Sequence, residues 1–268
     1  MTRRNFYEII NESSFNFKAE YNRIYSLFYD GNGYGCSVCA IVDEHFDAFP
    51  SDLIGRVQSL TDFDETYGFD FPKNPFNVTS DELISMCEYM FNLGSWAIKY
   101  AEGLMDYSDY EYTKYFLNLV SSCIKDLYHT RVERNGFIIF VPEKQEVIAT
   151  AEIVEKEVAL SILEYHHYSI RGNLSKKKGI LKLMADDIEP QRKVLNGINK
   201  SFTDILFQML NKFVRHNNND NEYISTLSPK ELETCYDDIY QMWLLAKLEI
   251  DNIERKKRAE ETLKQINA

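Results

Sequence analysis

The chain has 268 residues, 44% of them hydrophobic, and a formal net charge of −12. This composition supports a packed core and excludes an intrinsically disordered chain. No apolar run approaches the roughly 20 residues that a membrane-spanning helix needs, and the N-terminal sequence lacks the apolar stretch of a secretory signal peptide. We therefore expect a cytoplasmic protein that does not interact with membranes.

The negative charge lies almost entirely in the first half of the chain. Residues 1–150 contain 12 basic and 23 acidic side chains, whereas residues 151–268 contain 18 and 19. Because nucleic-acid binding depends on positive charge, the second half is the better candidate for contact with RNA. The acidic first half could face a basic protein partner, or it could simply keep the protein soluble.

The first half is predicted to be mostly helical. Glu82 after Thr79 or Ser80 is typical of a helix start. Residues 58–78 are rich in turn residues and aromatics, and we interpret them as an irregular linker. The expected helices cover residues 3–29 with a break near 13–14, residues 37–49, 79–100 and 108–128.

A change of period over residues 130–142 predicts a small β-hairpin. Asn135-Gly136 lies between two short strand-like runs, and this dipeptide in such a context is typical of a two-residue hairpin turn. An isolated hairpin is only marginally stable, so we expect it to pack on a helix. It ends an acidic N-terminal domain that we place at residues 1–145.

Residues 146–268 are predicted to form a second, helical domain. The last helix has the clearest start, because Ser228 and Pro229 are followed by Glu231, which completes a capping box. This helix should continue for more than 30 residues. Three other helices are expected in this domain. The first covers residues 146–165, and the second begins after Ser175 as its cap and ends before Pro190. The third begins at Gln191 or Lys200 and ends at His216.

Two residue pairs suggest metal or redox chemistry, but neither forms a complete motif. Cys36 and Cys39 have CxxC spacing, yet a zinc site needs about four ligands and no second such motif occurs. His166 and His167 could bind a metal or act in acid–base catalysis. However, consecutive histidines point to different sides, and a histidine near a helix C-terminus also suits the helix dipole. We expect no metal and no other cofactor, since the common nucleotide-binding motifs are also absent.

Residues 211–220, NKFVRHNNND, end an amphipathic helix and begin a polar loop. The apolar face includes Met209 and Phe213, and His216 lies three residues further, so we expect His216 to extend the inward face with Arg215 to one side. Asn217 can supply the left-handed residue that ends such a helix. A purely structural interpretation of this segment is therefore available.

This segment also resembles HEPN-type helical domains, as found in bacterial abortive-infection (phage-defence) proteins. The resemblance rests on Phe213 to Asn217, the polar loop, and Tyr236 to Met242 in the long helix, and it covers about residues 146–254. It implies a HEPN-like four-helix bundle that often forms a homodimer. Active members carry an Arg-x4–6-His motif, in which the arginine stabilises phosphate charge and the histidine assists attack of the RNA 2′-hydroxyl without a metal.

The ribonuclease motif is incomplete in this chain. Arg215 matches the arginine and His216 follows it directly, but Asp220, Asn221 and Glu222 stand where the histidine is expected. The sequence therefore predicts a mainly α protein with three possible roles. It binds or cleaves RNA through Arg215 and His216, it is a non-catalytic regulatory or assembly module with a protein partner, or it has no nucleic-acid role. Further candidate RNA-binding residues are Arg171, Lys176, Lys177, Lys178 and Asn217.

Overall fold

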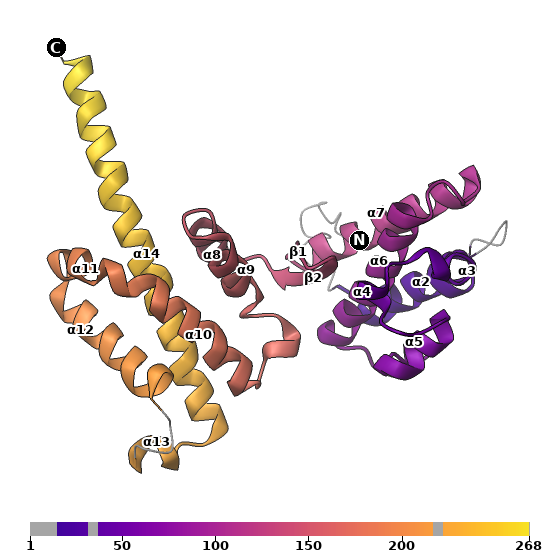
Figure 1. The fold of residues 1–268 in the computed structure, drawn as a ribbon, viewed down its shortest axis with the longest axis horizontal. Coiled ribbons are helices and arrows are strands. Elements are labelled where there is room, and N and C mark those ends of the chain that lie inside the picture. Colours follow the sequence, from indigo (N-terminus) through magenta and orange to yellow (C-terminus); the bar gives the residue numbers. More distant parts are fainter. Residues whose placement is uncertain (1–14, 32–36, 217–221, 268) are drawn as a thin grey trace, which may run out of the picture. The chain divides into compact units, whose positions relative to one another are not determined.

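The computed structural model describes residues 15–31, 37–216 and 222–267 (Figure 1). The protein is mainly helical and contains the expected two-stranded hairpin, which confirms the coarse fold class. The chain divides into two compact units, Met1–Phe140 and Val141–Ala268. The domain boundary that the sequence suggested, after residue 145, lies a few residues beyond this division. Within the described ranges, no helix is long and apolar enough to cross a membrane.

The first unit consists of short helices packed around two long ones. A capping box between Thr79 and Glu82 starts the first long helix, as expected. The prediction of an irregular linker over residues 58–78 is wrong in part. Ser59 caps a helix there, and Gly68 ends it with a φ of 72°. The elements are α2 (Phe17–Tyr29), α3 (Val38–Glu44), η1 (Phe46–Ala48), α4 (Ser51–Ile54), α5 (Leu60–Tyr67), α6 (Ser80–Tyr100), α7 (Tyr107–Asp126), β1 (His129–Arg134) and β2 (Phe137–Pro142).

The hairpin is fixed by its turn and by one face of α6. Asn135 and Gly136 have φ values of 54° and 82°, the positive values that a two-residue hairpin turn requires. The Asn92 amide donates to the carbonyl oxygen of Ile138 and accepts from its N–H, each at 2.7 Å. The Trp96 indole donates to Gly136 O at 3.1 Å. Residues four apart on α6 thus hold the hairpin, because they lie on one side of the helix.

The second unit contains more breaks than the sequence suggested. The helix predicted over 146–165 is two helices, and Asn173, not Ser175, caps α10 by accepting from Lys176 N at 3.1 Å. The capping box at the start of the last helix is confirmed. The elements are α8 (Gln145–Ala151), α9 (Lys156–Glu164), η2 (Tyr168–Ile170), α10 (Leu174–Ile188), η3 (Glu189–Gln191), α11 (Arg192–Ile198), α12 (Lys200–Met209), the π-helical turn η4 (Leu210–Arg215), α13 (Glu222–Thr226) and α14 (Pro229–Ile266).

The core of the second unit forms around the aromatic face of α14. Trp243 is fully buried, and its indole N–H donates to Met184 O at 2.7 Å. Tyr240 is also fully buried, and its hydroxyl donates to Ile162 O at 2.8 Å. Large aromatic groups therefore fill the core while their polar atoms remain hydrogen-bonded. This avoids the decrease in stability that an unpaired buried donor causes. These contacts hold α14 against both α9 and α10.

Candidate functional site

Arg215, the first candidate residue, ends the turn η4 in the middle of a cluster of acceptors. Its guanidinium donates to Ala185 O at 3.1 Å and to Asn211 Oδ1 at 3.3 Å. Nη1 lies 2.6 Å from Glu189 Oε2, outside hydrogen-bond alignment, and Nη2 lies 3.9 Å from a carboxylate oxygen of Asp186. The side chain remains 30% exposed. Two carboxylates therefore compensate its charge, and it joins η4 to the end of α10.

His216 does not extend the apolar face, so that expectation is wrong. Phe213 and Val214 are buried, whereas His216 is exposed. The reason is the π-helical turn, in which His216 N donates to Asn211 O five residues earlier, at 3.1 Å. A π turn holds more residues than an α turn, so spacing counted in steps of three and four no longer predicts the buried side. Asn217 lies outside the described residues.

The three consecutive lysines of α10 lie in three different environments. Lys176 is exposed, and Lys177 is buried. Lys178 donates to His216 O at 3.0 Å, and burial, followed by the charge of Lys182, lowers its pKa. The predicted basic run is therefore not one continuous surface, because successive helix residues point about 100° apart.

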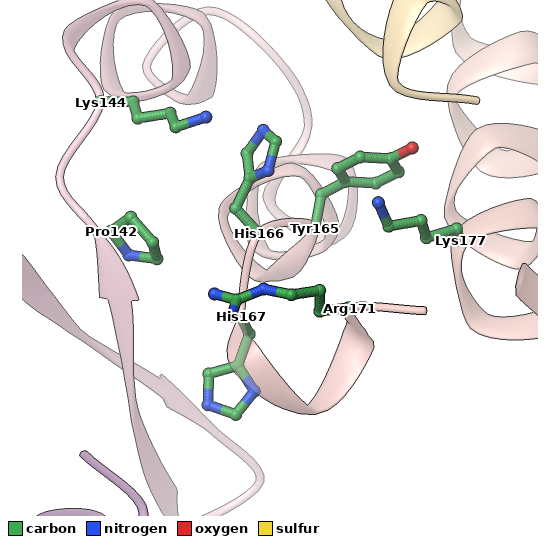
Figure 2. A pocket seen from close by; sticks show the side chains of 7 residues that line it. All are labelled: Pro142, Lys144, Tyr165, His166, His167, Arg171 and Lys177. Atoms are coloured by element: carbon green, nitrogen blue, oxygen red, sulfur yellow. The ribbon is translucent and has the colours of Figure 1, made fainter. Parts of the chain in front are cut away.

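A pocket lies beside the connection between α9 and α10 (Figure 2). It has a volume of about 210 Å³, and it contains two of the predicted RNA-binding residues, Arg171 and Lys177. In the part of the chain that the structure describes, its lining includes several nitrogen-bearing side chains and no carboxylate. The lining residues are Pro142, Lys144, Tyr165, His166, His167, Arg171 and Lys177.

Lys177 is a buried residue of the pocket lining, and its charge is already compensated. Its Nζ lies 2.6 Å from Asp237 Oδ1 and 2.8 Å from Glu233 Oε1, and 4.8 Å from the centre of the Tyr165 ring. Glu233 also accepts from Gly172 N at 2.8 Å. The hydrogen bond from Lys177, followed by that from Gly172, lowers the pKa of Glu233. Lys177 therefore attaches α10 and the preceding turn to α14.

His166 is fixed in the pocket wall by two tyrosines. The rings of Tyr165 and Tyr240 are stacked with centroids 4.0 Å apart, and the imidazole meets each of them edge-on at 5.2 and 5.1 Å. Burial, followed by the charge of Lys144, lowers the pKa of His166 to about 4. Its Nε2 atom is buried without a hydrogen-bond partner. The ring is consequently neutral at ordinary pH and has unused hydrogen-bonding capacity.

His167 points away from His166, as the sequence predicted for consecutive histidines (Figure 2). Its Nδ1 accepts from Ser169 N at 3.3 Å and lies 2.7 Å from Ser169 Oγ. The two imidazoles do not form a chelate. Over residues 15–31, 37–216 and 222–267, no group of three metal-binding side chains occurs, and Cys36 lies outside these ranges.

Sequence reasoning missed Lys144 as a site residue, although it recognised Arg171 and Lys177. Lys144 directly precedes α8, whereas His166 follows α9, and no spacing in the sequence indicates that the two side chains line one pocket. A possible signal was a lysine two residues after the strand that ends at Pro142, because the loops that follow such elements often carry binding residues. No family model, curated protein or solved structure matches this chain.

Proposed function

We propose that the C-terminal unit is a HEPN-like module that binds RNA in the pocket beside Arg171 and does not cut it at Arg215–His216. The observation that carries this proposal is the lining of the pocket, which combines Lys144, Arg171 and two imidazoles without a carboxylate. Guanidinium and ammonium groups that face an open space bind phosphate through charge-assisted hydrogen bonds.

The size of the pocket supports a phosphate group as the ligand. Its volume of about 210 Å³ is below the roughly 300–1,000 Å³ of ordinary small-molecule sites. A phosphate with part of its sugar fits such a space, whereas a whole dinucleotide cofactor does not. The remainder of the ligand must then lie outside the pocket, which agrees with a chain of nucleotides.

The environment of Arg215 argues for binding without cleavage. An arginine that stabilises a reacting phosphate must direct its donors at that phosphate, but Arg215 directs them at Ala185 and Asn211, and its charge is paired with Glu189. Within the proposal, α9, α10, α12 and α14 are the four helices of the HEPN-like bundle. A homodimer, and a role in cytoplasmic phage defence with a protein partner for the acidic first half, belong to the same proposal.

The test is the affinity of the purified full chain for single-stranded RNA that has both terminal and internal phosphates, measured by fluorescence anisotropy. We expect Arg171→Ala and Lys144→Ala each to weaken binding about tenfold, the equivalent of one charged hydrogen bond. Lys182→Ala is the matched control, because Lys182 is an exposed lysine of α10 outside the pocket.

Two results would contradict the proposal. One is a wild-type protein that does not bind RNA, or that loses as much affinity in Lys182→Ala as in the pocket variants. The other is RNA cleavage in EDTA that disappears in Arg215→Ala, because it would restore the nuclease hypothesis and remove the non-catalytic one.

A further inference from the structure

We propose that the outer edge of strand β1 binds a second copy of this chain, which adds its own β1 in antiparallel orientation. The two hairpins then form one sheet in the order β2, β1, partner β1, partner β2, with the two copies of Val132 opposite each other. This surface belongs to the first unit, and the inference does not depend on RNA binding by the second. It follows from the hydrogen bonds of the hairpin and from the charges along β1.

The two-residue turn determines which backbone groups of the hairpin face outward. In such a hairpin the residues that flank the turn, here Arg134 and Phe137, form a hydrogen-bonded pair, and outward and inward residues alternate from there. The bonds of Ile138 to Asn92 agree with this pattern, because both of its backbone groups are directed at α6. The outward residues include Arg131 and Glu133 on β1 and Ile138, Phe140 and Pro142 on β2.

The outward edge of β2 is already closed. Ile138 uses both backbone groups in its bonds to Asn92, and Phe140 N donates to Glu88 Oε1 at 2.6 Å. Pro142 has no N–H to donate. Among residues 137–142 no outward donor therefore remains for another strand, and the sheet cannot grow on this side.

The outward edge of β1 is open. Over the described ranges, no protein group bonds the outward N–H and C=O groups of Arg131 and Glu133. Both side chains are exposed, whereas Val132 between them is buried. A strand edge whose backbone groups have no protein partner is a template for another strand. Because only one edge of the hairpin is open, the addition of one further hairpin ends the assembly at a dimer.

The charges along β1 favour a second β1 as the added strand. When two antiparallel β1 strands are centred on Val132, Arg131 of each copy lies opposite Glu133 of the other. Each of these pairs combines opposite charges with an exchange of backbone hydrogen bonds, and such pairs stabilise a sheet. A centre at residue 131 or 133 would instead place like charges directly opposite each other, which destabilises a sheet.

The side chains of Arg131 and Glu133 have no ion pair within the part of the chain that the structure describes. Glu133 contributes to the raised pKa of Lys99, after the hydrogen bond of Lys99 with Tyr100, but its side chain remains exposed. Charges on a strand edge usually keep sheets apart. On β1 their alternating sign permits pairing in one register and opposes the neighbouring ones.

Sedimentation velocity of the full chain at increasing concentration tests this inference. We expect the wild type to form a reversible dimer. Arg131→Glu and Glu133→Arg should each weaken the dimer about tenfold, because each places like charges opposite each other. An equimolar mixture of the two variants should dimerise as well as the wild type, since a negative edge then meets a positive one. Lys182→Glu is the control, because it reverses one exposed charge in the second unit.

Each other outcome overturns the inference. A wild type that stays monomeric at every concentration removes the second copy as the occupant of this edge. A dimer that neither variant weakens, or that Lys182→Glu weakens as much, forms through another surface, such as the helical bundle. A mixture that associates no better than either variant alone contradicts the antiparallel register on Val132.

Discussion

Arg171 and Arg215 both lie at helix ends of the same unit, and they differ in the charges around them. Arg215 has Glu189 at 2.6 Å and Asp186 at 3.9 Å. Arg171 is exposed and lines a pocket whose lining residues include no carboxylate, and its positive charge helps to lower the pKa of Glu233 in α14. The comparison teaches that the residue type and the place at a helix end do not by themselves determine the surroundings of an arginine.

The largest expected effect is on stability and comes from Lys177, which lines the pocket as Arg171 does but is paired with carboxylates as Arg215 is. We expect Lys177→Met to lower the free energy of unfolding by about 3 kcal/mol, because it leaves Glu233 and Asp237 beside an uncharged side chain. Urea denaturation measures the change, and Lys182→Met should stay within about 0.5 kcal/mol of the wild type. A Lys177→Met protein as stable as the wild type would show that this lysine is available for ligand.

The next largest effect is on the salt dependence of RNA affinity, which should differ between variants of the two arginines. Arg171→Ala should reduce the dependence of log K on log salt concentration by about 0.7, the value for one phosphate contact with a single strand. Arg215→Ala should leave this slope unchanged, because its guanidinium is directed at protein acceptors. Anisotropy titrations at several salt concentrations provide the slopes. Equal slopes for the two variants would remove the distinction between the sites.

Arg215 should instead matter for stability. We expect Arg215→Ala to lower the free energy of unfolding by about 1 kcal/mol, the usual value for partly exposed hydrogen bonds and ion pairs. Arg215→Lys keeps the charge but not the fork that reaches both Ala185 and Asn211, so it should recover only part of the loss. Full recovery in Arg215→Lys would mean that charge alone holds this end of α10.

The smallest effect is the contribution of His166 to the pH dependence of the free energy of unfolding. Its pKa in the folded state is lowered to about 4, below the usual value of about 6.5 in an unfolded chain. Between these values the unfolded chain binds a proton that the folded chain does not, so stability present above about pH 6.5 is lost as the pH falls toward 4. The stability advantage of the wild type over His166→Gln should therefore be smaller at pH 5 than at pH 7. If this stability difference is equal at both pH values, the imidazole of His166 is not held neutral by burial in the folded state.

Local features were predictable from the sequence, whereas the site was only partly so. The Asn135-Gly136 turn and the capping box at Ser228 depend on a few neighbouring residues, and both formed as expected. The compensation of Arg215 depends on Glu189, which lies in another element. No periodicity indicates that contact, because only tertiary packing brings the two side chains together.

The exposure of His216 illustrates a second limit. The expected inward position assumed a regular α-helix through the end of the segment, and the hydrogen bond from His216 N to Asn211 O shows a wider turn. The apolar face at Phe213 remained correct. A single change of helical pitch therefore altered the environment of the one histidine that the RNA hypothesis required, while the prediction of a helix was unaffected.

The length of α14 has a consequence for amide exchange with deuterated solvent. The helix runs from Pro229 to Ile266, but its last buried residue is Lys247, and all its residues from Glu254 to Ile266 are exposed. Amides near Trp243 can exchange only when the whole unit opens, whereas those beyond Glu254 are protected by helix hydrogen bonds alone. Protection factors should therefore fall by several orders of magnitude along one uninterrupted helix. Exchange rates along this one helix would therefore report two free energies, that of global unfolding near Trp243 and that of local fraying beyond Glu254.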